Sequence, residues 1–432
     1  MAIAVFQVDT SLFKQQALRW AQQFNELCFF QSNGYNDHYA EIDSLLAVGA
    51  QASFTAQVGT DTFRALEIFK AEHPHCWMPG FFSYDLKNEI EDLQTLHSDR
   101  LDFPEAYFFV PKVLLHFEQD AVKIDASDPA AVYKVILDFD INTLAEPLTK
   151  DQKINFRTRM SKQAYMEVFQ KLIGHIQQGD IYEVNLCQEF FAEDVTIDPL
   201  AVYEKLNSIS PTPFSCFFKK DSRYILSASP ERFLAKRGQT IISQPIKGTA
   251  PRGKNAVEDL ERIDALRNNP KEIAENVMIV DLVRNDLTRS AAKGTVKAEK
   301  QLEVQTFQQV HQLVSTVSCR QKEGLSDVEV IRNTFPAGSM TGAPKISAMR
   351  LCDRYEASKR GIYAGTVGYF APNGDFDFNV VIRSLLYNRE EGYLSFHTGG
   401  ALTMEAEAEK EYAECLLKAS AILRTLDAKL TS

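Results

Sequence analysis

Between Ser161 and Gly179, apolar residues recur every three or four positions, which is the spacing of an amphipathic helix. Ser161 is a plausible N-cap for this helix, and Gly179 can end it in a left-handed conformation. Asn269 followed by Pro270 predicts the start of another helix, because proline suits the first helical turn. The apolar positions of the first helix are Tyr165, Val168, Phe169, Leu172, Ile173 and Ile176.

Shorter apolar runs, bounded by polar residues or glycine, predict β-strands. Residues 378–387 and 393–396 are expected to pair antiparallel around the turn 388–392. Further helices are expected over 12–24 and 406–426. Strands and helices come in blocks rather than in strict alternation, so the pattern favours an α+β fold over a doubly wound parallel sheet. The other predicted strands cover 107–115, 181–186, 224–227 and 240–244.

Composition is that of an ordinary globular protein, with 45% hydrophobic and 24% charged residues. The net charge of −11 argues against nonspecific binding to nucleic acid or acidic membranes. An anionic substrate would therefore need cationic groups concentrated at its site.

No apolar run reaches the roughly 18 residues of a membrane span. The first residues lack a basic region and a cleavage site, and the seven cysteines form no Cys-x-x-Cys pair. We therefore expect a cytoplasmic protein with reduced thiols.

The 432 residues would suggest about three domains by length alone. The candidate functional residues, however, spread from Glu231 to Lys418, which favours one large catalytic body. The polar segment 150–153 is the best candidate for a linker. We therefore predict an amino-terminal region, 1–150, and a catalytic region, 151–432, that together form one compact body.

Lys247 is the first candidate for chemistry. It lies in the segment 244–253, which is punctuated by glycine and proline and follows a predicted strand. A lysine on a rigid turn can hold a nucleophilic amine at a fixed point. A solvated surface lysine is the alternative, and the residues around Lys247 do not decide between the two.

Two predicted helices carry acidic residues at helical spacing. Glu272 and Glu275 are three positions apart, and Glu411, Glu414 and Lys418 are spaced by three and four. These spacings place each set on one face of its helix. Four carboxylates from two facing helices would suit Mg²⁺, which prefers oxygen ligands. Solvated acidic faces are the alternative.

Five motifs, in order, resemble those of the chorismate-utilising enzymes, a family that includes anthranilate, aminodeoxychorismate, isochorismate and salicylate synthases. The resemblance runs from about Ser161 to the C-terminus. It implies two large antiparallel sheets packed as a sandwich, with helices outside and the site in a deep cleft. The motifs are Ser229–Phe233, Pro245–Gly253, Glu275–Leu282, Phe335–Lys345 and Glu411–Glu414.

The resemblance implies that chorismate, a dianion, is the substrate. One of its carboxylates would lie on Mg²⁺ held by the four glutamates, and Arg383 would bind the other. On a strand, Arg383 shares its face with Val381 and Leu385, so it should be buried and need a partner. A structural ion pair is the alternative. The other substrate contacts that the resemblance implies are Tyr363, Thr341, Gly399, Gly400 and Lys418.

A lysine at position 247, rather than alanine, resembles the large component of aminodeoxychorismate synthase. This implies that Lys247, kept neutral by burial and nearby cations, attacks ring C2 while Glu231 protonates the departing 4-hydroxyl. Ammonia from a separate glutamine amidotransferase subunit would then add at C4. The product would be 4-amino-4-deoxychorismate, a precursor of p-aminobenzoate and folate.

Two other functions stay open: anthranilate synthase component I, and a catalytically silent subunit that binds chorismate or a partner. Isochorismate and salicylate synthases are disfavoured, because Glu183 stands where those relatives have a water-activating lysine. Gln312 stands where many members have histidine, and His311 lies one residue earlier. A one-residue shift on a strand reverses the direction of a side chain, so His311 is not predicted as a site residue.

Overall fold

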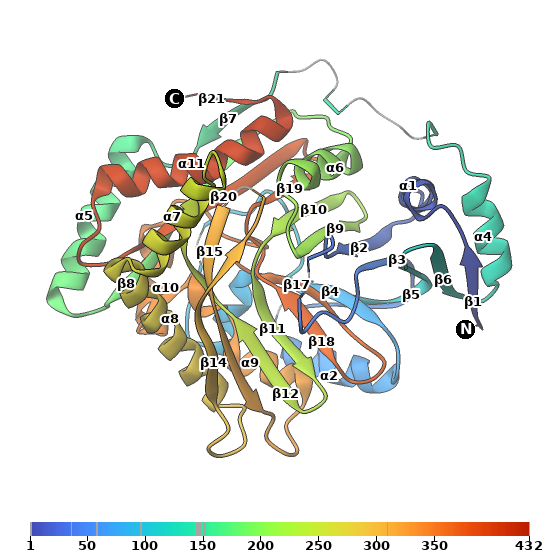
Figure 1. Ribbon diagram of the computed structural model, residues 1–432, viewed down its shortest axis with the longest axis horizontal. Helices are drawn as coiled ribbons and strands as arrows, with labels where there is room; N and C mark the ends of the chain where they lie inside the picture. Colours follow the sequence, from blue (N-terminus) through green and yellow to red (C-terminus); the bar gives the residue numbers. More distant parts are fainter. Residues whose placement is uncertain are drawn as a thin grey trace.

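The computed structural model describes residues 2–35, 37–57, 59–95, 97–143, 148–149, 153–308 and 310–431. Over these residues the chain has an α+β fold, which confirms the predicted class (Figure 1). The predicted linker lies outside the described residues except for Lys153. The α-helices are α1 (Thr10–Ala21), α2 (Thr62–Glu72), α3 (Lys87–Ile90), α4 (Pro129–Leu137), α5 (Lys162–Gln178), α6 (Pro199–Ile209), α7 (Ala256–Arg267), α8 (Pro270–Thr288), α9 (Asp327–Thr334), α10 (Lys345–Tyr355) and α11 (Ala408–Leu426).

The strands join in one continuous hydrogen-bonded network. Among the described strands, pairing is antiparallel except between β7 and β21. Two short 3₁₀ helices, η1 (Tyr84–Leu86) and η2 (Gly338–Met340), complete the elements. The strands are β1 (Ala2–Gln7), β2 (Glu26–Gln31), β3 (Ser44–Thr55), β4 (Met78–Phe82), β5 (Ala106–Phe117), β6 (Ala121–Ala126), β7 (Asn155–Thr158), β8 (Glu183–Ala192), β9 (Phe214–Lys220), β10 (Arg223–Ser229), β11 (Arg232–Arg237), β12 (Thr240–Gln244), β13 (Ile246–Pro251), β14 (Lys297–Thr306), β15 (Val310–Arg320), β16 (Gly342–Ala343), β17 (Thr366–Phe370), β18 (Phe376–Asn379), β19 (Ser384–Asn388), β20 (Tyr393–Leu402) and β21 (Lys429–Leu430).

The network folds so that its two halves face each other across one apolar core. Alternate residues of β3 show this: Leu45 points into the core, whereas Leu46 points to the opposite face of the strand. From the other half, Phe378 of β18 and Val317 of β15 enter the same core. The predicted sandwich is thus two halves of a single sheet system.

Helices cover the outer face, as expected. Phe13 of α1, Leu200 of α6 and Ile422 of α11 pack in a second apolar cluster against the outward side chains of the strands. A third, smaller cluster joins α5 and α10 to β8, with Leu172 and Ala348 among its buried residues. This arrangement places α8 and α11, the two helices with the glutamates, on strands of the same network.

The predicted helices lie where their sequence signals placed them. Helix α5 begins after the N-cap Ser161, whose side chain accepts a hydrogen bond from the Ala164 amide, and ends at Gly179 with φ of 83°. Helix α8 begins at Pro270 with Asn269 as its N-cap. The helices expected near 12–24 and 406–426 correspond to α1 and α11.

The predicted strand 378–387 is wrong in one respect that affects the site. The chain forms two strands, β18 and β19, which are separated by residues 380–383. The Val380 amide donates to the carbonyl of Glu231, and Arg383 has a φ of 51°. The face-sharing argument for Arg383 therefore fails, because Arg383 lies in a connection and not on a strand. The expected pairing across 388–392 is confirmed, with Leu386 opposite Ser395.

Both predicted regions contribute to the same core. Strand β4, from the amino-terminal region, pairs with β17 from the catalytic region, with Gly80 opposite Gly368. Phe108 and Phe378 lie with their ring centroids 6.2 Å apart. The boundary near residue 150 stays a prediction. Among the described residues, the longest and most apolar helices fall short of what crossing a membrane requires.

Candidate active site

Lys247 lies near the start of β13, where the pairing of this strand with β15 is irregular. Its neighbour Gly248 has a φ of 96°, and a Cβ atom there would lie 2.8 Å from Oε2 of Glu272. The carbonyl of Lys247 accepts a hydrogen bond from the Asn276 side chain of α8. Glycine at 248 therefore lets β13 approach the acidic face of α8 closely.

The amine of Lys247 is held inside the protein. Its side chain is 12% exposed, and its Nζ lies 2.6 Å from Oε1 of Glu183, the first residue of β8. Burial lowers the pKa of Lys247, but the carboxylates of Glu183, Glu275 and Glu231 outweigh it, so that the pKa is raised. The prediction of a neutral amine is therefore wrong for this state, because the groups around Lys247 are anionic.

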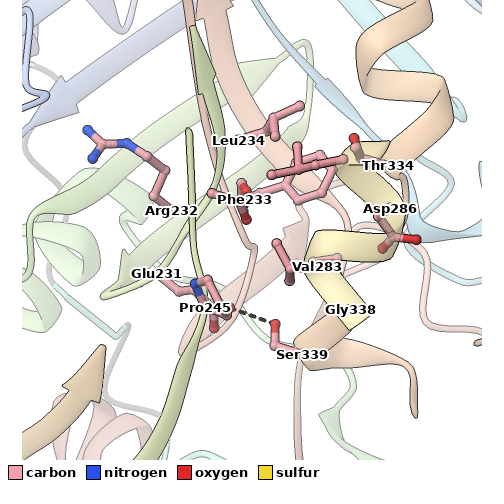
Figure 2. Close-up of a pocket in the computed structure, with 13 residues that line it drawn as sticks. Glu231, Arg232, Phe233, Leu234, Pro245, Val283, Asp286, Thr334, Gly338 and Ser339 are labelled. Carbon is pink, nitrogen blue, oxygen red and sulfur yellow. Dashed lines mark hydrogen bonds between the residues drawn. The ribbon is translucent and has the colours of Figure 1, made fainter. Parts of the chain in front are cut away.

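Glu231 stands between β10 and β11 and is 4% exposed. Its Oε1 accepts a hydrogen bond of 2.6 Å from the hydroxyl of Ser339 in η2 (Figure 2). Burial raises the pKa of Glu231 to about 7, although Ser339, Lys247 and Arg383 act in the opposite direction. A carboxyl group in this state can hold a proton near neutral pH and donate it.

Figure 2 shows Glu231 and Ser339 at one end of a pocket between β11 and α8. The remaining wall is largely apolar, with Phe233, Leu234 and Val283 among its side chains. This surrounding explains why the charged form of Glu231 is disfavoured.

Arg383 lies in the connection between β18 and β19, with the charge of Glu231 nearby. Among the described residues, its side chain forms no hydrogen bond and no ion pair. The alternative role of Arg383, a structural ion pair, is therefore not seen in this part of the chain. Burial lowers the pKa of Arg383, and the charge of Glu231 partly offsets this effect. A partly buried, unpaired guanidinium beside Glu231 is suited to bind an anion.

The four predicted glutamates lie on α8 and α11, and both helices approach the same region. Glu275 and Glu411 come within reach of one cation, the Nζ of Lys271, at 3.7 and 4.0 Å. Burial raises the pKa of Glu272, Glu275 and Glu411, and neighbouring carboxylates add to this rise. The carboxylates are thus close enough to repel one another.

Glu414 behaves differently from the other three. Burial raises the pKa of Glu414, but Lys418 outweighs this effect and the pKa is lowered. Nζ of Lys418 lies 2.9 Å from the Glu414 carboxylate and donates to the carbonyl of Gly399 at 2.8 Å. Lys418, predicted to contact substrate, is therefore engaged with a glutamate and the backbone of β20.

The donor chemistry of this glutamate set fits a hard divalent cation. Within the described part of the chain, the buried Oε1 of Glu275 has no hydrogen-bond partner, so this atom can accept a ligand. Over the described part of the chain, however, no three histidine, cysteine, aspartate or glutamate side chains converge as metal ligands. The ammonium group of Lys271 on α8 lies 4.0 Å from the carboxylate of Glu411 on α11.

Tyr363 and Thr341, two other predicted substrate contacts, have side chains that contact neighbouring protein groups. Tyr363 is buried, stacks on His397 with ring centroids 4.8 Å apart, and its hydroxyl lies 3.6 Å from Sγ of Cys187. Thr341 is fully buried and donates its hydroxyl to the carbonyl of Gly338. Both side chains are therefore buried and bonded to other parts of the protein, and their role as substrate contacts stays a prediction.

Gly399 and Gly400 of β20 lie very close to neighbouring groups. A Cβ atom on Gly399 would lie 2.3 Å from the carbonyl of Leu186, and one on Gly400 would lie 2.9 Å from Oε2 of Glu411. Larger residues would therefore displace β8 or the Glu411 carboxylate. His311 points elsewhere: it contacts Asp259 and Thr306. Its exclusion from the predicted site agrees with this position.

The family described as chorismate binding enzyme matches residues 25–424 of the chain. The chain belongs to this family. Among curated relatives, aminodeoxychorismate synthase from Streptomyces griseus is 42% identical over 271 residues, which are 62% of this chain and 37% of that protein. Aminodeoxychorismate synthase component 1 from Klebsiella aerogenes is 34% identical over 364 residues, covering 82% and 79% of the two chains.

Anthranilate synthase component 1 from Thermus thermophilus is also similar to this chorismate-binding enzyme, with 31% identity over 414 residues and 89% of both chains covered. Among solved structures, anthranilate synthase component I from Streptococcus pneumoniae superimposes with a TM-score of 0.77 at 24% identity. The superposition covers 90% of this chain and 95% of that one, and it shows that the fold is shared.

Three residues of this chorismate-binding enzyme stand in the site although they were not predicted as site residues. Ser339 lies within a recognised motif, so its position was a usable signal. Glu183 was noted only as the place of a missing lysine, and nothing in the sequence pairs it with Lys247. Lys271 directly precedes Glu272, and its sequence context is that of an ordinary lysine on a helix surface, so it gave no signal of a role in the site.

Proposed function

We propose that this chorismate-binding enzyme aminates chorismate at C4 to give 4-amino-4-deoxychorismate, as an aminodeoxychorismate synthase component I. The observation that carries this proposal is the placement of Lys247. Its amine is buried, fixed at 2.6 Å from Glu183, and electrostatically coupled to Glu231, the candidate acid. A nucleophile and an acid in one enclosed site are what a covalent displacement requires.

The first step needs Lys247 as a free amine, and Glu183 is the group that can accept its proton. When Lys247 is protonated, its nearest acceptor is the Glu183 carboxylate. Binding of the substrate displaces water, which disfavours the separated charges of the Lys247 ammonium and the Glu183 carboxylate. The ammonium group first passes one proton to the Glu183 carboxylate, and the free amine that results then bonds to ring C2, so that no base from outside the site is needed.

Bond breaking at C4 is the task of Glu231. As the C2–nitrogen bond forms, both double bonds of the ring shift and the C4–oxygen bond breaks. The protonated Glu231 gives its proton to the departing hydroxyl, which leaves as water. The pKa of about 7 that burial imposes on Glu231 keeps this proton available at neutral pH.

Ammonia then adds at C4, both double bonds shift back, and the C2–nitrogen bond breaks to release the amine of Lys247. The new ammonium group returns a proton to the Glu231 carboxylate. The name "component 1" of similar proteins indicates a second subunit in those enzymes. By analogy, we propose that a separate glutamine amidotransferase subunit delivers ammonia to this chain.

We propose Glu272, Glu275, Glu411 and Glu414 as the residues that would hold Mg²⁺. When bound, this ion would supply positive charge for one substrate carboxylate. The unpaired guanidinium of Arg383 is proposed to bind the other carboxylate. Tyr363, Thr341, Gly399, Gly400 and Lys418 are proposed as further substrate contacts, and Lys418 also pairs with Glu414.

The direct test is an assay of the purified protein with chorismate, MgCl₂ and ammonium chloride, with products identified by chromatography and mass spectrometry. We expect 4-amino-4-deoxychorismate, with no product when ammonium is omitted. Anthranilate as the main product would instead establish the second candidate, which the similarity to the Thermus thermophilus protein favours. Failure to consume chorismate would overturn both enzyme functions and favour a silent binding subunit.

Replacement of Arg383 by methionine should raise KM for chorismate about 10- to 100-fold, with a smaller effect on kcat. The expected size follows from the loss of charge-assisted hydrogen bonds to a carboxylate, about 1.5–3 kcal/mol. Steady-state kinetics at saturating ammonium measures it. Arg284, an exposed arginine paired with Asp281 on α8, gives the matched control Arg284→Met. An unchanged KM in Arg383→Met would exclude this arginine from substrate binding.

A further inference from the structure

Lys271 is a cation that stands between the two glutamate-bearing helices. It lies on the first turn of α8, and its Nζ reaches Glu275 of the same helix and Glu411 of α11. Glu411 is only 6% exposed, whereas Lys271 is 44% exposed. The ammonium group therefore caps a buried pair of carboxylates from the solvent side.

The distances show that this ammonium group is loosely held. At 3.7 and 4.0 Å, both contacts are longer than a hydrogen bond, and Oε1 of Glu275 has no hydrogen-bond partner. Lys410, on α11, forms a direct contact of 2.6 Å with Glu407 by comparison. Lys271 therefore balances the charge of two carboxylates without satisfying their oxygen atoms.

We propose that Lys271 is a counter-ion that competes with the metal: its ammonium group balances the charges of Glu275 and Glu411 until a divalent cation takes its place. This inference rests on the proposed Mg²⁺ site. It accounts for carboxylates that lie near one another and yet do not converge as ligands in the described structure. A divalent cation would satisfy the oxygen atoms that the ammonium group leaves without partners.

Two effects of removing the positive charge at 271 act in the same direction. The metal would no longer compete with the ammonium group for the carboxylates or be repelled by it. Without metal, Glu275 and Glu411 would lose the one cation that they share, with Lys247 acting on Glu275 and Lys418 on Glu411, and this loss destabilises the metal-free protein. By linkage, both effects strengthen metal binding.

The test compares binding of Mn²⁺, used as a probe of Mg²⁺ sites, to the purified full-length protein without chorismate. Free Mn²⁺ is measured by electron paramagnetic resonance, and melting temperatures are recorded with and without the ion. Lys271→Met should bind Mn²⁺ about three- to tenfold more tightly, because a partly exposed ion pair has a modest strength. It should melt lower than wild type without the ion and recover when Mn²⁺ is added.

The controls separate charge from structure. Lys271→Arg keeps the charge and should bind Mn²⁺ as wild type does, and Lys410→Met should change nothing. Equal or weaker binding by Lys271→Met, with binding retained in wild type, would overturn this inference alone. No binding by wild type, with or without chorismate, would overturn the proposed metal site and this inference with it.

Discussion

Replacement of Lys247 by alanine will lower the rate of chorismate amination by about a thousandfold or more. Loss of a covalent nucleophile removes a chemical step, which is a far larger effect than the loss of one binding contact. The measurement is the rate of formation of 4-amino-4-deoxychorismate at saturating chorismate, MgCl₂ and ammonium. The product mixture is analysed as well, because a site without the lysine can direct ammonia to a different carbon.

A loss of activity must be separated from a loss of folding. Lys247→Ala leaves the buried carboxylate of Glu183 without its cation, which is destabilising. The double variant Lys247→Ala/Glu183→Gln removes both charges and should recover most of the melting temperature but none of the amination. Lys254→Ala, an exposed lysine beyond the same strand, is the matched control. Full amination by the folded double variant would exclude a covalent role for Lys247.

Much of the fold and one part of the site could be predicted from short-range patterns in the sequence. The apolar spacing from Tyr165 to Ile176 and the residues Ser161 and Gly179 fix α5, because each acts within its own helix. The same is true of the glutamates on α8 and α11. Residues three and four apart lie on one face of a helix, so the sequence was sufficient to place Glu272 beside Glu275 and Glu411 beside Glu414.

Contacts between distant segments were not predictable in this way. Glu183 and Lys247 are 64 residues apart, and their contact depends on how β8 and β13 are brought together. The sign of the pKa shift of Lys247 followed from that contact, so the prediction of a neutral amine failed with it. Arg383 was misplaced for a related reason. Its φ of 51° arises where the chain passes from β18 to β19, and the apolar residues around it read as an uninterrupted strand.

The second large effect is expected for Glu231. Glu231→Gln should lower kcat about 10²- to 10⁴-fold, which is the usual contribution of a general acid. An acid must be protonated to act, and burial raises the pKa of Glu231 to about 7. In wild type, kcat/KM should therefore fall as pH rises through about 7, and this limb should be absent from Glu231→Gln. Glu390→Gln, an exposed glutamate in the turn after β19, serves as the control.

Ser339 provides an independent check that this limb belongs to Glu231. Its hydroxyl donates to Oε1 of Glu231 and stabilises the charged form of the carboxylate. Ser339→Ala should raise the pKa of Glu231, because the charged form loses a donor while the apolar wall remains. The falling limb of kcat/KM should then move to higher pH, with activity retained below pH 7. A limb that stays in place in Ser339→Ala and persists in Glu231→Gln would assign the titration to another group.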